Sequence, residues 1–296
     1  MNMFKLLILF LMVSCSSTKN TDGPVKKVDN AAFKKEKILN NNEVADYYLN
    51  NSKALNPALQ DETLDRYTKD EVHLLENTND PLVEISARCS KGEFDQAFAV
   101  ASKVFNRYQK VAAYWNQVAN CHLNQGSHRK ALLFYNKALE VVPNYVPALN
   151  NIGVMYSRQG QDQKALVAFE KANKQSRFAK TPRYNLAKLY LSYGIADLAL
   201  PMFQSLLSSS PNDADLLNAV GSCYFLMSDY QQAYNYYAQI PRGEIEKSEV
   251  GLNLAITLKK LGRVADAQKI FKAVKGPKNT KLKQYYLVVE TQLGEI

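Results

Sequence analysis

One spacing of 34 residues governs the chain from residue 112 onward. An alanine recurs at this spacing without insertion or deletion: Ala131, Ala165, Ala199, Ala233 and Ala267. An aromatic residue follows each alanine by four positions: Tyr135, Phe169, Phe203, Tyr237 and Phe271. A small residue precedes each alanine by twelve positions: Ala119, Gly153, Ala187, Gly221 and Ala255. Such a period predicts an array of one repeated structural unit, because self-similarity at this length is typical of solenoids.

Each unit is predicted to be two helices joined by a short turn. The turn position holds glycine in four units and serine in the other: Gly126, Gly160, Gly194, Ser228 and Gly262. Glycine ends helices well because it adopts the left-handed backbone conformation without steric cost. The small residues let the two helices approach, and the aromatic side chains fill the gaps beside them. Stacking is then required, since a single pair cannot bury its apolar faces alone.

This register resembles the tetratricopeptide repeat, W-x2-L-G-x2-Y…A-x3-F…P at a period of 34. The first clear unit reads Trp115-x2-Val118-Ala119-x2-His122…Ala131-x3-Tyr135…Pro143. Pro211 repeats the closing proline, and three units depart from it: Arg177, Ile245 and Asn279. The resemblance implies an all-α, right-handed α-solenoid of antiparallel helix pairs.

The predicted organisation has six parts. They are a lipoprotein signal peptide at 1–14, a lipidated cysteine with a disordered tether at 15–43, an N-terminal helical cover at 44–77, a degenerate repeat at 78–111, five clear repeats at 112–281 and a capping helix at 282–296. The degenerate repeat keeps phase through Gly92, Phe94 and Ala97. Glu84 and Arg88 occupy positions that are apolar core in the other units.

The first fifteen residues predict the compartment. The apolar run from Leu6 to Val13 is too short to span a bilayer and fits the apolar part of a signal peptide. The sequence Met12-Val13-Ser14-Cys15 resembles a bacterial lipobox, which implies acylation of Cys15, for example with palmitate. Several acyl chains give stable anchoring. The alternative is a plain secretory signal with a cysteine nearby.

The segment that follows predicts where the anchor lies. Ser16 is not the aspartate that resembles an inner-membrane retention signal, so we expect the outer membrane and a periplasm-facing array. The tether holds six lysines and four acidic residues and little to bury, which is typical of disorder. It either acts as a solvated leash or places its lysines on anionic lipid headgroups.

Composition and motifs argue against catalysis and nucleic-acid binding. The net charge of +9 is spread along the chain, without a basic block in a nucleic-acid motif. We expect no enzyme, no metal and no cofactor, because catalytic and phosphate-binding motifs are absent from the sequence. His122 takes a core position and is expected to pack. The thiols of Cys89, Cys121 and Cys223 are expected to remain free, without a bridge.

The first helices of the units are predicted to line a concave surface that binds an extended partner. The candidate partner-binding residues at the family's inward positions are Asn116, Asn120, Asn150, Arg158, Tyr184, Lys188, Asn218, Ser222 and Lys259. Asparagine amides offer donors and acceptors to a peptide backbone, and the cations favour an acidic segment. Asn151, Asn185 and Asn253 belong to the family's consensus and need no ligand. Binding through the outer face, or between array ends, stays open.

Three functions follow from this architecture. The chain is similar to pilotin-type lipoproteins and to gliding-motility lipoproteins of the outer membrane, which implies a protein-binding scaffold of a cell-envelope motility apparatus. The second is an adaptor that docks peptidoglycan-remodelling or outer-membrane assembly enzymes. A substrate-binding or enzymatic role is the third, and catalytic residues for it are lacking. The oligomeric state stays open.

Overall fold

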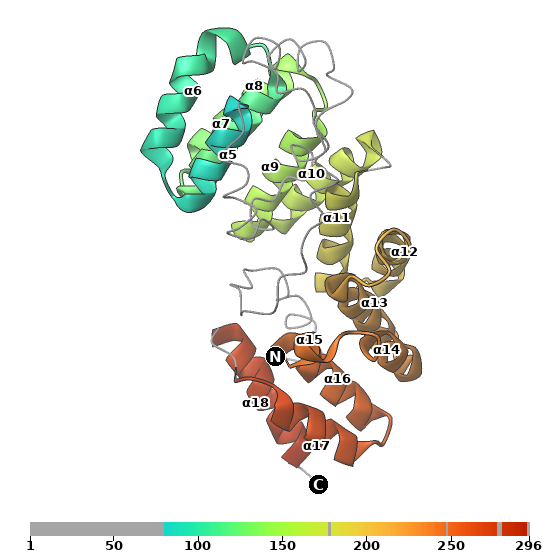
Figure 1. Ribbon diagram of the computed structural model, residues 1–296. Coiled ribbons are helices and arrows are strands. Elements are labelled where there is room, and N and C mark those ends of the chain that lie inside the picture. Colours follow the sequence, from blue (N-terminus) through green and yellow to red (C-terminus); the bar gives the residue numbers. More distant parts are fainter. Residues whose placement is uncertain (1–79, 177–178, 247, 277–279, 295–296) are drawn as a thin grey trace, which may run out of the picture. The chain divides into compact units, whose positions relative to one another are not determined.

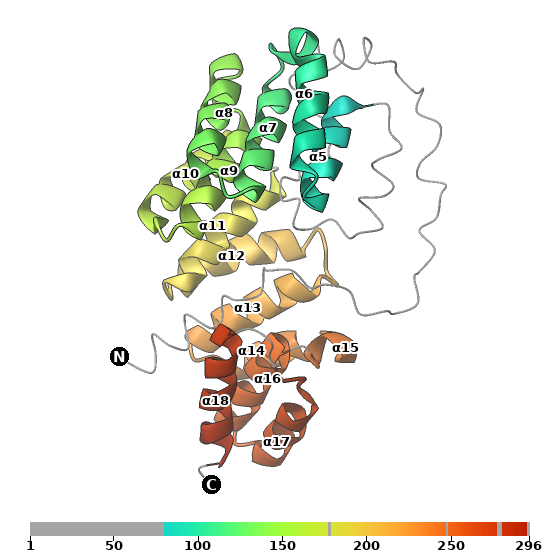
Figure 2. The same ribbon diagram turned by 90° about the vertical axis from the view of Figure 1, so that its left-hand side faces the viewer.

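The fold was analysed in a computed structural model, which describes residues 80–176, 179–246, 248–276 and 280–294. Within these ranges every regular element is a helix, which confirms the predicted all-α array (Figures 1 and 2). The signal peptide, Cys15, the tether and the helical cover lie outside the described residues. The chain divides into two compact units, and the boundary along the sequence falls between Pro182 and Arg183. Each unit is described by itself.

The N-terminal unit consists of three helix pairs. They are α5 (Pro81–Lys91) with α6 (Phe94–Tyr108), α7 (Ala112–Asn124) with α8 (His128–Val141), and α9 (Val146–Arg158) with α10 (Asp162–Gln175). The degenerate repeat therefore folds as a helix pair, α5 and α6, like the clear repeats that follow it. One buried apolar cluster runs through all three pairs and includes Leu82, Tyr108 and Tyr135.

The C-terminal unit begins within α11 and continues the same pattern. Its helices are α11 (Lys180–Ser192), α12 (Ala196–Leu207), α13 (Ala214–Leu226), α14 (Tyr230–Tyr237), α15 (Arg242–Ile245), α16 (Ser248–Lys260), α17 (Val264–Ala273) and α18 (Thr280–Gly294). Pro241 precedes the one-turn helix α15, and the second helix of that repeat, α14, is short. The last helix, α18, packs on α16 and buries Tyr285 and Val289, as a capping helix does.

A ring of the second helix lies over a small residue of the first helix in each pair where that residue is glycine. A Cβ atom added at Gly153 would lie 2.5 Å from the ring of Phe169, and one added at Gly221 would lie 2.6 Å from the ring of Tyr237. Both distances are shorter than ordinary van der Waals contact, so only glycine fits without movement of the ring. The predicted role of the small residues and aromatics is confirmed here.

The turn between the helices of a pair uses the left-handed backbone conformation. Five turn glycines, including Gly92 of the degenerate repeat, have φ between 69° and 82°, and Ser228 takes the same conformation at φ 63°. A residue with a Cβ atom is strained in this region, so serine is a less favourable turn residue there than glycine.

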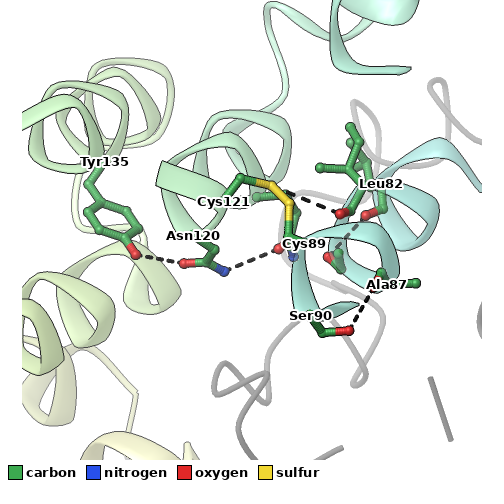
Figure 3. The surroundings of a disulfide bond; sticks show 10 residues. Leu82, Ala87, Cys89, Ser90, Asn120, Cys121 and Tyr135 are labelled. Carbon is green, nitrogen blue, oxygen red and sulfur yellow. Dashed lines mark hydrogen bonds between the residues drawn. A yellow bond between two sulfur atoms is a disulfide. The ribbon is translucent and has the colours of Figure 1, made fainter. Parts of the chain in front are cut away.

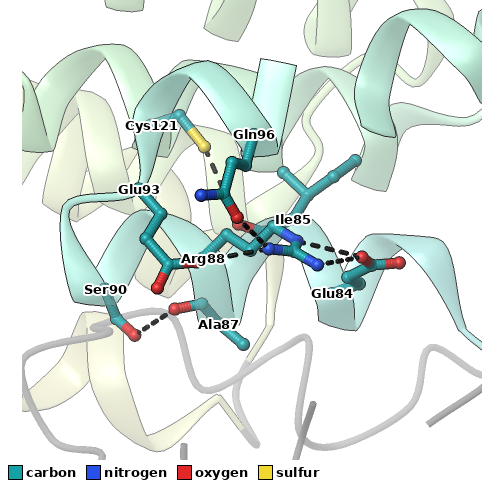
Figure 4. A network of polar contacts seen from close by, with 8 residues as sticks. All are labelled: Glu84, Ile85, Ala87, Arg88, Ser90, Glu93, Gln96 and Cys121. Carbon is teal, nitrogen blue, oxygen red and sulfur yellow. Dashed lines mark hydrogen bonds and ion pairs between the residues drawn. The ribbon is translucent and has the colours of Figure 1, made fainter. Parts of the chain in front are cut away.

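The charged residues of the degenerate repeat pair with one another at the surface instead of entering the core. Arg88 binds the carboxylate of Glu84 at 2.9 Å and that of Glu93 at 3.2 Å, and it also donates to Gln96 (Figure 4). The side chains of Arg88 and Glu84 are 29% and 32% exposed. This ion-pair network replaces the apolar contact that Val118 and His122 provide in the next repeat.

A disulfide joins the degenerate repeat to the first clear repeat, and the expectation of free thiols is wrong for this pair. Cys89 of α5 is bonded to Cys121 of α7, with their Cα atoms 5.2 Å apart (Figure 3). Cys223 remains free and buried, as expected. The bond fixes α5 on α7, in addition to the buried apolar side chains of α5 such as Leu82 and Ile85.

Loss of this disulfide should destabilise the N-terminal unit. The bond spans 32 residues, and a loop of this size corresponds to about 2–4 kcal/mol of unfolding free energy. We expect reductant to lower the urea midpoint of the wild-type chain. The Cys89→Ser/Cys121→Ser double variant is the control, because its midpoint should not respond to reductant. Equal midpoints for wild type and double variant without reductant would contradict this prediction.

Candidate partner-binding site

The nine predicted partner-binding residues lie on the first helices α7, α9, α11, α13 and α16, and they fall into two groups. Six are buried: Asn116, Asn120, Asn150, Tyr184, Asn218 and Ser222. The three cations are more accessible, with Arg158 exposed and Lys188 and Lys259 partly exposed. The positions predicted to face a partner thus hold buried side chains in some repeats and accessible side chains in others.

In the N-terminal unit the buried amides link neighbouring repeats. Asn151 of α9 donates to Asn120 at 2.9 Å and to Asn116 at 3.2 Å, both on α7. The hydroxyl of Tyr135, on α8, donates to the same Asn120 oxygen at 2.7 Å (Figure 3). Asn150 donates to the Asn151 oxygen at 3.3 Å. These bonds join three helices from two repeats.

The C-terminal unit repeats this arrangement. Asn253 of α16 donates to Asn218 of α13 at 3.1 Å, across the same 35-residue separation that joins Asn151 to Asn116. Tyr285 of α18 donates to the Asn253 oxygen at 2.9 Å. Ser222 donates to the Asn218 carbonyl at 2.8 Å and bonds to the Tyr237 hydroxyl at 3.1 Å. Asn151 and Asn253 therefore use their amides in packing between repeats, and that they need no ligand stays a prediction.

These contacts correct the chemistry assigned to the buried members. The sequence predicts that their amides serve a partner's backbone, whereas packing between repeats already uses the amides of Asn116, Asn120 and Asn218. Tyr184 packs edge-on against Phe203 within its own repeat, with ring centroids 5.6 Å apart. The accessible part of the predicted site is therefore its three cations, and partner binding by these stays a prediction.

Lys259 has a structural contact at the end of the chain. Its amino group donates to the carbonyl of Gln292, in the last turn of α18. A cation at a helix C-terminus satisfies a carbonyl and interacts favourably with the helix dipole. Its neighbour Lys260 is exposed and remains accessible on the same helix.

Lys188 interacts electrostatically with an acidic residue of another repeat, which was not expected from the sequence. Glu249 on α16 interacts with Lys188 and with Asp215 on α13. Burial raises the pKa of Glu249 to about 7, with Lys188 lowering it and Asp215 raising it. Its Oε1 atom is buried without a hydrogen-bond partner among the described residues. Asp215 and Glu249 occupy the same position in successive repeats, 34 residues apart. This spacing was the one sequence feature that could have indicated that the two carboxyl groups lie on stacked helices.

His122 has the packing role predicted for it. Its ring stacks on Phe98 at 4.5 Å and on Phe134 at 5.1 Å between ring centroids. Burial lowers its pKa below the usual 6.5. Across the described ranges, His, Cys, Asp and Glu side chains nowhere gather as three or more in an arrangement that could hold a metal ion. No helix in those ranges is both long and apolar enough to cross a bilayer.

The repeated helix pairs, the turn glycines and the ring-over-small-residue contacts have counterparts in known proteins. Two tetratricopeptide-repeat sequence profiles match, one over residues 112–145 and one over 134–167. The chain contains tetratricopeptide repeats. The profile matches and the helix pairs of both units support the resemblance inferred from the period.

Curated relatives share the repeat over part of their length. Anaphase-promoting complex subunit 3 of Schizosaccharomyces pombe is 29% identical over 123 residues, which cover 42% of this chain and 18% of the relative. The complex's subunit CDC16 of Saccharomyces cerevisiae is 23% identical over 197 residues, covering 64% and 24%. The matches therefore span about a fifth to a quarter of these relatives.

Solved structures show the same fold. Pseudomonas aeruginosa PilF superposes with a TM-score of 0.62 at 17% identity, covering 76% of this chain and 99% of that one. YrrB, a TPR protein with an unusual peptide-binding site, superposes with a TM-score of 0.54 at 19% identity, covering 66% and 98%. At these identities the likeness is one of fold.

Titration of Glu249 should make stability depend on pH. Its folded-state pKa of about 7 lies above the ordinary 4.5, so the folded chain favours the protonated form. The contribution of protonated Glu249 to the unfolding free energy is fully present below the ordinary pKa of 4.5 and is lost as pH rises through about 7. We expect Glu249→Gln to remove a decline in unfolding free energy on the order of 3 kcal/mol between about pH 4 and pH 8.

Urea unfolding of wild type and variants at both pH values measures this difference. Glu290→Gln, at an exposed site on α18, is the matched control and should keep the decline. The lowered pKa of His122 produces a stability loss as pH falls below about 6.5, but every variant shares it. Equal pH profiles for wild type and Glu249→Gln would contradict the prediction.

Proposed function

We propose that this chain is a non-enzymatic scaffold lipoprotein that binds protein partners in a bacterial cell envelope. Its tetratricopeptide repeats carry the proposal, because stacked helix pairs present extended surfaces to other proteins. The accessible cations on the first helices, Arg158, Lys188 and Lys260, are the contacts we assign to a partner. Lys188 interacts electrostatically with Glu249, so the partner segment at that point should carry both charges.

The disulfide supports the proposed compartment. Disulfides persist in oxidising environments such as the periplasm and are rare in the cytosol. Cys89–Cys121 is therefore a second reason, besides the lipobox-like sequence at Cys15, to assign the chain to the envelope. We propose anchoring at the outer membrane through acylated Cys15, with the repeats facing the periplasm.

The proposed pathway is a motility apparatus, either gliding motility or a type IV pilus. The fold likeness to PilF supports this by architecture alone. An adaptor for peptidoglycan-remodelling or outer-membrane assembly enzymes would use the same surface, so the identity of the partner distinguishes the two functions.

Replacement of the proposed lipidated cysteine tests the anchor. We expect the wild-type chain to incorporate a palmitate analogue and to fractionate with membranes, since several acyl chains give stable anchoring. Cys15→Ala should incorporate none and appear in the soluble periplasmic fraction. Cys223→Ala, which changes a buried free thiol, is the control and should stay with membranes. Unchanged membrane fractionation of Cys15→Ala would refute the anchor.

Removal of the accessible first-helix cations tests the partner surface. Arg158→Ala, Lys188→Ala and Lys260→Ala together should reduce partner recovery in affinity purification by about tenfold, which corresponds to about 1.4 kcal/mol of binding. The chain should remain folded because these side chains are at or near the surface. A variant with Lys269→Ala, Lys272→Ala and Lys275→Ala loses the same charge elsewhere and is the matched control.

The recovered proteins decide between the functions. Pilus or gliding components lost only from the first-helix variant support the proposed pathway. Peptidoglycan or outer-membrane assembly enzymes in their place support the adaptor. Equal losses from both variants would show that net charge, and not this surface, determines binding.

A further inference from the structure

Lysines recur in register on the second helices of the N-terminal unit. Lys103 of α6, Lys137 of α8 and Lys171 of α10 are spaced by 34 residues and are all exposed. A second pair, Lys130 and Lys164, occupies another shared position on α8 and α10 and is exposed as well. Stacked repeats place equivalent residues on the corresponding helix of each successive repeat, so these positions form two rows of amines along the stack.

Exposed apolar side chains lie between the two rows. Leu133 on α8 is 56% exposed, and Val167 on α10, at the same repeat position, is 65% exposed. Residues three and seven positions apart share one face of a helix. Each of these helices therefore presents lysine, an apolar side chain and lysine along one outward stripe, and we call this pair of stripes the lysine–apolar face.

The same positions in the C-terminal unit lack this pattern. They hold Leu198, Pro201 and Ser205 on α12, Gln232 and Asn235 on α14, and Asp266, Lys269 and Ala273 on α17, so none of these helices has an apolar side chain between two lysines. The repeat fold itself therefore does not require lysine at these positions. The pattern is a property of α8 and α10, with Lys103 extending one row to α6.

The charges of α8 and α10 reinforce the face. These two helices carry six basic residues and three acidic residues: Arg129, Lys130, Lys137, Lys164, Lys171, Lys174, Glu140, Asp162 and Glu170. Lys137 forms an ion pair with Glu140, and Lys164 donates to Gln161. Exposed contacts of this kind contribute little, so both amines are able to turn toward an anion.

Amines on both sides of exposed apolar groups suit one kind of surface. Lysine side chains attract anionic headgroup phosphates, and apolar side chains between them enter the boundary with the acyl chains. Lipid headgroups have no fixed positions, so long flexible lysines in two rows match them without a specific geometry. We propose that the lysine–apolar face of α8 and α10 binds the anionic lipid surface of a membrane.

This face is distinct from the first-helix cations assigned to a protein partner, and its binding does not require Cys15. Binding is therefore tested with the full chain carrying Cys15→Ala. Vesicles of phosphatidylcholine, alone or mixed with phosphatidylglycerol, are sedimented with the protein at low and high salt. We expect tighter binding to the anionic vesicles, with the difference lost at high salt because screening weakens exposed charge interactions.

Two variants isolate the face. Lys130→Gln, Lys137→Gln, Lys164→Gln and Lys171→Gln together should weaken binding to anionic vesicles on the order of a hundredfold, since basic side chains near an anionic surface each add to binding. Glutamine keeps helix propensity close to that of lysine, so the helices should persist. Leu133→Ser with Val167→Ser should weaken binding on the order of tenfold by removing the inserted apolar groups.

A matched variant loses the same charge from exposed positions of the C-terminal unit: Lys269→Gln, Lys272→Gln, Lys275→Gln and Lys283→Gln. It should bind anionic vesicles as the parent does. The proposal is overturned if this control loses as much affinity as the first variant, or if the parent binds both vesicle types equally. Binding to soluble polyglutamate that depends on the same four lysines, without vesicle binding, would assign the face to an acidic protein instead.

Discussion

The contact between an aromatic ring and a small residue sets the distance between the helices of a pair. At Gly153 and Gly221 the ring lies where a Cβ atom would be, 2.5 and 2.6 Å from the position of that atom. A second set of contacts joins the first helices of successive repeats, through the amide bonds from Asn151 to α7 and from Asn253 to α13. The array therefore combines apolar contacts within a pair with amide bonds between pairs.

Periodicity predicted the elements that repeat and could not predict those that break the repeat. The helix pairs and turns follow from residues that share a position in five units. The Cys89–Cys121 bond does not, because Cys89 stands two positions away from the place equivalent to Cys121 in the degenerate unit. Which sulfur faces which depends on the rotation of α5 against α7, and a spacing contains no such information.

The candidate site shows a second limit of sequence reasoning. A polar residue at an inward position looks the same in the sequence whether its side chain faces solvent or a neighbouring repeat. The pattern therefore predicts a ligand in both cases. The distinction depends on donors 31 and 35 residues away, as between Asn151 and the oxygens of Asn120 and Asn116. Exposure separates the cations Arg158 and Lys188 from these amides. The interaction of Lys188 with Glu249 depends on the packing of α11 and α16 and is not visible in the sequence.

The position of the disulfide along the chain has a consequence for export. In a chain that crosses a membrane from its N-terminus, Cys89 and Cys121 emerge in succession while Cys223 is still about a hundred residues behind. If the thiol of Cys15 is blocked by acylation, oxidation of the cysteines in the order in which they emerge would form the pair found in the structure. For a chain exported as proposed, the order of emergence would therefore favour the Cys89–Cys121 pair over a bond to Cys223.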